Sequence, residues 1–166
     1  GVKFDFIGFD ACLMATLETA YVLEPYADYM IASEEYEPGG GWYYTDFLTY
    51  YAENVSMDTE ELGKLIIDDF AQYYGNRDVT LSLISLREVP YVCRKLESFL
   101  DNAEDAIRRD NDSFRTMSMA RSNAREYCNG QIDQVDILDL VKQTDFRGRE
   151  ELIDALKSCV KYYNNS

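Results

Sequence analysis

The sequence of 166 residues contains no histidine. Without histidine the chain cannot bind a metal through imidazole, and it cannot complete a Ser-His-Asp triad or a Cys-His dyad from its own residues. Its four cysteines form no CxxC pair and no other close spacing, which excludes a zinc framework. A nucleophile of this chain would therefore need a histidine from another segment.

Long apolar runs and basic residues are also scarce. No apolar run approaches the roughly 18 residues that cross a bilayer, and no signal-peptide pattern occurs. Lys and Arg number 16 against 31 Asp and Glu, which gives a net charge of −15. A chain this acidic repels nucleic acid and anionic membranes, and it attracts basic peptides, cations such as calcium, or a basic partner. Acidity that serves only solubility is an equally good explanation.

The start of the chain indicates a fragment. Gly1 stands where a methionine would begin a newly made protein, and the chain runs directly into a strand pattern. We expect an internal fragment or a processed chain.

The first half of the chain has the pattern of an α/β fold. A largely apolar strand is followed at once by a helix that ends at Pro25, and a second short strand then implies a parallel pair with a right-handed crossover. Asp58 and Glu61 resemble a helix capping box. A third strand alternates polar and apolar residues and is predicted to lie near an edge. The predicted strands cover 2–9, 29–33 and 79–86, and the later helices cover 44–54 and 58–73.

The second half is predicted to be helical. From Val89 onward apolar residues recur at helical spacing, and no segment has a convincing strand pattern. We therefore expect an α/β core over 1–88 and a helical C-terminal extension over 89–166, packed as one unit. The helices predicted in the extension cover 89–107, 113–127, a short segment from Asp136, and 150–162.

Cys12 differs from the other three cysteines in its position. It follows the predicted strand 2–9, and in open α/β sheets sites form at the carboxyl ends of strands. A helix N-terminus directly after it would stabilise a thiolate. Cys93 and Cys159 lie on apolar helix faces, as core cysteines do, while Cys128 could be core, a surface thiol or half of a disulfide. Cys12 is therefore the candidate nucleophile, with simple packing as the alternative.

Asp10 precedes Cys12 by two positions. In an extended stretch both side chains would project to the same side and could face one cleft. A carboxylate beside a thiol disfavours the thiolate form, so it does not help a nucleophile directly. We interpret Asp10 as a recognition group for a basic side chain. Capping of the following turn is an equally good explanation.

Several stretches resemble the nucleophile region of clostripain-like cysteine peptidases, which belong to the same clan as caspases and gingipains. They are Phe9–Glu18 (FDACLMATLE), Ala27–Glu35 (ADYMIASEE) and Pro38–Tyr44 (PGGGWYY). Two later stretches, Ala120–Tyr127 and Val135–Leu140, resemble that family's C-terminal helical part. The resemblance covers nearly the whole chain, and its first 44 residues are the most specific.

The resemblance implies a caspase-like α/β/α sandwich with a mainly parallel sheet. It also implies hydrolysis of peptide bonds after arginine or lysine, activation by internal cleavage, and a secreted or periplasmic location. Cys12 would be the nucleophile, and the histidine would come from an upstream light chain or N-terminal segment. Activation by calcium is implied as well, although no calcium-loop pattern such as DxDxDG occurs.

The acidic, glycine-rich loop 34–42 supplies the other candidates for a pocket that binds a basic side chain. With Asp10 at the pocket wall, Glu35 and Glu37 (with Glu34) would add negative potential, and Trp42 would form a second wall. A charge-assisted contact of this kind contributes roughly 1.5–3 kcal/mol, enough to prefer basic over neutral side chains. The alternative is a solvated acidic turn that Trp42 anchors to the core.

Two other functions compete with the peptidase. One is a catalytically inactive pseudo-peptidase or binding subunit of the same fold. The other is an acidic calcium-binding or adhesion domain of a secreted protein, which would leave Cys12 disulfide-bonded or unreactive.

Overall fold

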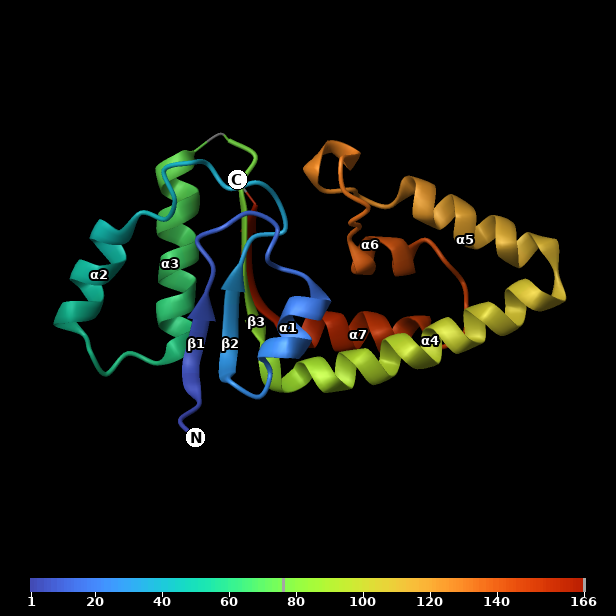
Figure 1. The fold of residues 1–166 in the computed structure, drawn as a ribbon, viewed down its shortest axis with the longest axis horizontal. Coiled ribbons are helices and arrows are strands. Elements are labelled where there is room, and N and C mark those ends of the chain that lie inside the picture. Colours follow the sequence, from blue (N-terminus) through green and yellow to red (C-terminus); the bar gives the residue numbers. More distant parts are fainter. Residues whose placement is uncertain (76, 166) are drawn as a thin grey trace. The chain divides into compact units, whose positions relative to one another are not determined.

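The computed structural model describes residues 1–75 and 77–165. It divides into two compact units, one made of Gly1–Val89 with Cys159–Ser166 and the other of Pro90–Ser158. The first unit holds a sheet with its helices, and the second is helical (Figure 1). That the helical extension packs on the core stays a prediction.

The described residues form a four-stranded sheet with the strand order β1-β2-β3-β4. β1 and β2 are parallel, as the sequence predicts, and the helix α1 (Leu17–Leu23) lies between them in the chain. β3 runs antiparallel to β2, and β4 runs antiparallel to β3. The α/β class is confirmed, and in the described sheet the parallel pairing is that of β1 with β2. The strands are β1 (Phe4–Gly8), β2 (Ala27–Ala32), β3 (Thr80–Ser85) and β4 (Val160–Asn165).

β3 lies between β2 and β4, so the prediction that this strand is near an edge is wrong. Its alternating polar residues suggested one solvated face, but Thr80 and Ser82 are buried and hydrogen-bonded, and Ser85 is buried as well. The Ser82 hydroxyl donates to Glu34 Oε1 at 2.5 Å, and the Thr80 hydroxyl lies 3.0 Å from that of Ser33. Serine and threonine are tolerated inside a sheet when their hydroxyls are hydrogen-bonded. The alternation of polar and apolar residues does not distinguish such buried residues from solvent-exposed ones.

The last strand, β4, corrects a second prediction. The helix expected over 150–162 ends at Cys159 as α7 (Arg149–Cys159), and the chain continues as β4. Tyr162 pairs with Leu83 of β3, and its hydroxyl donates to Asp68 at 2.8 Å. Pairing with a buried strand outweighs the helical periodicity of this segment, because β structure depends on its neighbours more than on intrinsic preference.

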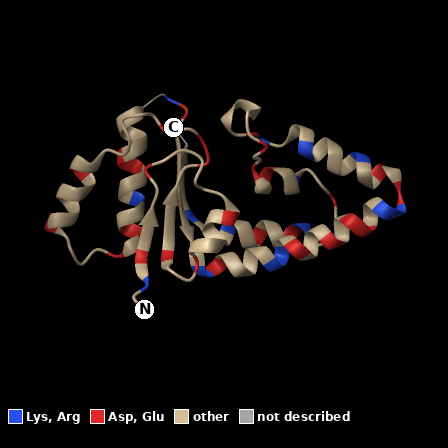
Figure 2. Cartoon of the chain, viewed as in Figure 1, with Lys and Arg blue, Asp and Glu red and all other residues tan. Residues whose placement is uncertain are grey.

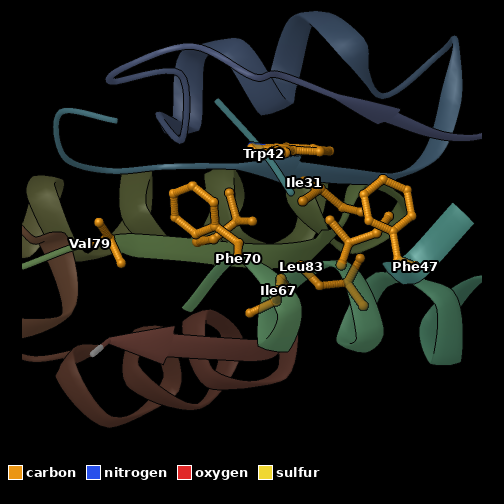
Figure 3. Packing of buried hydrophobic residues seen from close by; sticks show 9 residues of the cluster. Ile31, Trp42, Phe47, Ile67, Phe70, Val79 and Leu83 are labelled. Atoms are coloured by element: carbon orange, nitrogen blue, oxygen red, sulfur yellow. The ribbon is translucent and has the colours of Figure 1, made fainter. Parts of the chain in front are cut away.

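The helix α3 (Thr59–Tyr74) covers β3 and β4. It begins after Asp58, whose carboxylate accepts the Glu61 N–H at 2.9 Å, as the capping pattern predicts. Gly63 allows close packing, since a Cβ atom there would lie 2.8 Å from Leu83 Cδ1. Figure 3 shows the core cluster that results. Its buried members are Ile31, Trp42, Phe47, Ile66, Ile67, Phe70, Val79, Leu81 and Leu83.

The remaining helices follow the predicted order with shifted ends. The helix expected over 113–127 ends at Asn123, because Glu126 forms a bridge with Val135 and pairs with Arg121 at 2.7 Å. These elements are α2 (Tyr44–Glu53), η1 (Leu86–Glu88), α4 (Val89–Arg109), α5 (Asn111–Asn123), η2 (Cys128–Gly130) and α6 (Ile137–Lys142).

Core packing of α3 gives a stability prediction. Phe70 is 1% exposed and Phe4 is 59% exposed. We expect Phe70→Ala to lower the free energy of unfolding by about 3–5 kcal/mol, since it leaves a cavity in a dense core. The same change at Phe4 should cost about 0.5 kcal/mol. Urea unfolding followed by circular dichroism measures both, and equal losses would contradict this account of the core.

Candidate active site

Cys12 lies in a turn beyond the end of β1. The turn is held to the end of β2, because Leu13 N–H donates to Glu35 O at 3.2 Å and Ala15 N–H donates to Ser33 O at 2.9 Å. Leu13 has a φ of +64°, a left-handed conformation that a leucine rarely adopts. The strained residue next to Cys12 sets the path of the chain at the end of the strand.

α1 does not begin at Cys12, so the predicted helix directly after the cysteine is wrong. The helix starts at Leu17, with Thr16 as its N-cap, and Thr16 Oγ1 accepts the Thr19 N–H at 3.0 Å. The left-handed turn at Leu13 prevents an earlier start, because helical hydrogen bonds need right-handed dihedrals. The free N–H groups of α1 therefore do not directly follow Cys12 in the chain, as the predicted stabilisation of a thiolate by the helix dipole required.

The backbone N–H that lies beside the Cys12 sulfur belongs to Glu37. Glu37 N–H donates to Cys12 Sγ at 3.2 Å, and the thiol approaches Glu37 O at 3.7 Å. Cys12 is half-buried, and its thiol is free rather than disulfide-bonded. A backbone N–H thus points at the atom on which a thiolate would carry its charge.

Asp10 is held by the same loop through both carboxylate oxygens. Trp42 N–H donates to Oδ1 at 3.1 Å, and the Tyr44 hydroxyl donates to Oδ2 at 2.9 Å. Gly41, with a φ of +67°, makes room for the carboxylate, because a Cβ atom there would lie 2.6 Å from Oδ2. The sequence predicts Asp10 and Trp42 at this site but misses Gly41 and Tyr44. The third of three consecutive glycines, followed by an aromatic run, was the available signal.

The carboxyl group of Glu37 lies beside that of Asp10. Trp42 Nε1 donates to Glu37 Oε1 at 3.5 Å, while Oε2 is buried without a hydrogen-bond donor. Burial raises the pKa of Glu37 to about 8, and the adjacent Asp10 adds to the rise, although the Trp42 bond opposes it. When Glu37 is protonated, its Oε2 can donate a hydrogen bond to Asp10. If both carboxyls were ionised, neither could donate, and the buried oxygen would have no partner.

The other predicted carboxylates of the loop make separate contacts. Glu35 Oε1 accepts the Tyr36 N–H at 2.9 Å, and Glu34 Oε1 accepts the Ser82 hydroxyl. Glu35 contacts the turn that carries Cys12 through its backbone carbonyl, which accepts the Leu13 N–H, rather than through its side chain. The structure therefore brings Asp10, Glu37 and Trp42 together near the cysteine and directs the carboxylates of Glu34 and Glu35 elsewhere.

The acidic charge is concentrated in the unit that carries Cys12. That unit contains 17 acidic and 5 basic residues, whereas the helical unit contains 14 acidic and 11 basic residues. Figure 2 shows the basic residues mainly on helices of the second unit. Charges of one sign around a site raise the local concentration of ligands of opposite sign.

These features agree with a comparison against protein-family models. The model of the clostripain family matches residues 1–165. The chain belongs to the clostripain family. Its predicted membership is thereby confirmed, and with it a cysteine peptidase fold.

Solved structures of clostripain-family proteases share the fold. A clostripain from Bacteroides thetaiotaomicron ATCC 29148, in complex with the peptide inhibitor BTN-VLTK-AOMK, is 22% identical with a TM-score of 0.74, and the match covers 100% of this chain and 70% of that one. An inactive zymogen C11 protease from Parabacteroides distasonis is 22% identical with a TM-score of 0.73, covering 99% of this chain and 45% of the zymogen. No curated protein sequence matches the chain.

A third structure is a secreted C11 cysteine protease from B. thetaiotaomicron in complex with an irreversible peptide inhibitor. It is 19% identical with a TM-score of 0.75, and the match covers 100% of this chain and 46% of that one. The chain thus spans less than half the length of two of these clostripain-family structures.

The described ranges 1–75 and 77–165 hold no group of three or more His, Cys, Asp or Glu residues that could bind a metal ion. In the same part of the chain, no helix is both long and apolar enough to cross a membrane.

The buried carboxyl of Glu37 predicts a pH-dependent stability. Its pKa is higher in the folded chain than in the unfolded chain, so the folded state binds more protons between about pH 4.5 and about pH 8. Stability should fall as pH rises through that window, by on the order of 1 kcal/mol per pH unit, and Glu37→Gln should remove this fall.

Urea unfolding at pH 5, 7 and 9, followed by the fluorescence of the single tryptophan Trp42, measures this effect. Glu53→Gln, at an exposed position in α2, is the matched control and should keep the wild-type pH dependence. A Glu37→Gln variant that loses stability like the wild type would show that another group is responsible.

Proposed function

We propose that this chain supplies the nucleophile and the basic-residue pocket of a cysteine endopeptidase that cleaves after arginine or lysine. One observation carries the proposal: a single loop holds the Cys12 thiol through the Glu37 peptide and the Asp10 and Glu37 carboxyls through the two N–H groups of Trp42. A peptide carbonyl at the sulfur would place the preceding side chain near two acidic groups. Family membership supports the peptidase chemistry.

The proposed reaction begins when the Cys12 thiolate attacks the carbonyl carbon of the scissile peptide. The new S–C bond forms as the carbonyl π electrons move to oxygen, which backbone N–H groups, including that of Cys12, stabilise. The C–N bond then breaks, and the leaving amine takes a proton from a histidine of the partner segment. Water attacks the thioester, releasing a carboxylic acid and regenerating the thiol.

Asp10 and Glu37 would both bind the basic side chain of the substrate, and Trp42, which lies between the two carboxyls, would form the wall of the pocket. Trp42 binds both carboxyls, through its peptide N–H and its indole N–H. The inhibitor bound to the B. thetaiotaomicron clostripain has the sequence VLTK, which ends in a basic residue. That inhibitor supports a preference for a basic residue in the substrate of a protease with the same fold. Glu35 would contribute charge from the loop without contacting the side chain.

The histidine is proposed to come from an upstream segment or light chain. This chain has none, and it matches 45% and 46% of the length of two related proteases. A secreted or periplasmic location is proposed as well, since two similar structures are described as secreted proteases.

An inactive subunit of the same fold is the second candidate. The Glu37 peptide occupies both the acceptor and donor capacity of the Cys12 thiol, and one similar structure is described as an inactive zymogen. A His-Gly pair after a predicted strand in the upstream sequence would favour the active enzyme, and its absence would favour the inactive subunit.

Replacement of the nucleophile tests the peptidase. In the complete protein, with its upstream segment, Cys12→Ala should lower kcat/KM for fluorogenic peptides ending in Arg or Lys by roughly 10⁴-fold or more, because no thiolate remains to attack. Cys93→Ala, which also removes a half-buried thiol, is the control and should stay close to wild type. Cleavage that survives Cys12→Ala would mean that the nucleophile is a different residue.

Replacement of the pocket carboxylate tests the specificity. Asp10→Asn removes a charge and keeps the shape of the side chain. It should lower kcat/KM for an Arg peptide by roughly 10- to 100-fold and change cleavage of a Gln peptide little, since an interaction with a charged group is lost. Equal losses for both peptides would assign Asp10 to holding the loop instead of recognising substrate.

A further inference from the structure

The hydroxyl of Tyr44 holds the exposed carboxylate of Asp10. Tyr44 is the first residue of α2, and its hydroxyl donates to Asp10 Oδ2 at 2.9 Å. Its ring stacks on that of Trp42, with ring centroids 6.3 Å apart and ring planes at 27°. The centroid of the Phe47 ring lies 5.5 Å from that of Tyr44. Trp42 and Phe47 are buried core residues. The hydroxyl is thus fixed in place by the core, although the ring itself is half exposed.

This contact determines how Asp10 presents its oxygens. An ionised carboxylate has about four lone-pair sites, and the Trp42 N–H and Tyr44 hydroxyl occupy one on each oxygen. A protonated Glu37 Oε2 can take one of the remaining sites, which leaves one for an incoming cation; when Glu37 ionises, both are open and a guanidinium can use them in a bidentate pair. A carboxylate that is already oriented loses less conformational entropy when the ligand binds.

We propose that Tyr44 is a positioning residue for substrate recognition, whose hydroxyl orients the Asp10 carboxylate toward the basic side chain of the substrate. This inference rests on the proposed function. Burial and the adjacent Asp10 raise the pKa of Tyr44, so the hydroxyl keeps its proton and remains a donor over the neutral range.

Tyr74 provides a matched control from the other side of the same loop. Its hydroxyl donates to Gly41 O at 2.8 Å, and a Cβ atom at Gly40 would lie 2.7 Å from it. Tyr74 therefore supports the glycine loop from α3 through a backbone carbonyl, whereas Tyr44 acts on a carboxylate. A purely structural role of Tyr44 predicts that Tyr44→Phe and Tyr74→Phe behave alike.

The test compares Tyr44→Phe, Tyr74→Phe and Asp10→Asn in the complete protein, with fluorogenic peptides ending in Arg or Gln. Tyr44→Phe keeps the ring and removes only the donor. It should raise KM for the Arg peptide roughly tenfold, with kcat and the Gln peptide close to wild type. In the Asp10→Asn background, Tyr44→Phe should have no further effect, because a residue that acts through Asp10 has nothing left to orient.

Benzamidine, a cation without a scissile bond, gives a second readout. Its inhibition constant should rise by the same factor in Tyr44→Phe and stay unchanged in Tyr74→Phe, and circular dichroism checks that each variant is folded. An unchanged KM and inhibition constant in Tyr44→Phe, equal losses for both peptides, or an effect that persists beside Asp10→Asn would overturn the inference while the peptidase stands. No cleavage by the wild type would overturn the proposed function and this inference with it.

Discussion

The site depends on the closure of the acidic glycine loop over the turn that follows β1. Two backbone N–H groups of the loop donate to side chains of the turn: Trp42 N–H to Asp10 Oδ1 at 3.1 Å and Glu37 N–H to Cys12 Sγ at 3.2 Å. The bond to Asp10 needs the glycine at position 41, since a Cβ atom there would collide with the Asp10 carboxylate and the φ of +67° favours glycine. The loop and the turn therefore form one structure, and the groups proposed for attack and for recognition are positioned together.

Trp42 connects this closure to the stability of the domain. Its ring belongs to the core cluster with Ile31 and Phe70, while its two N–H groups bind the two carboxyls of the site. Burial beside the core is also what raises the pKa of Glu37 to about 8. Glu37 therefore keeps its proton at neutral pH, which limits the negative charge held beside Asp10. An incoming cation would favour release of that proton, so the proposed binding of a basic side chain would be coupled to ionisation of Glu37.

Much of this arrangement follows from local sequence. Cys12 and Asp10 are conspicuous at the end of an apolar strand, and the acidic loop with its glycines points to Glu37 and Trp42. The sequence alone does not separate Glu37 from Glu35, because both are loop glutamates two positions apart. Their difference arises from contacts: the Glu35 carboxylate accepts the next N–H along the chain, while the Glu37 carboxyl is buried beside Asp10.

The α/β core, the family and the candidate nucleophile could be predicted from the amino-acid sequence, because apolar periodicity and short motifs are local properties of the chain. Three features could not be predicted from it: residues 160–165 pair with β3 as a strand, the left-handed Leu13 precedes a later start of α1, and Tyr44 donates to Asp10. Each of these depends on an interaction between segments distant in the chain or on a backbone conformation that such an interaction stabilises. The free energy of such interactions cannot be estimated from a short stretch of sequence, because it depends on residues outside that stretch.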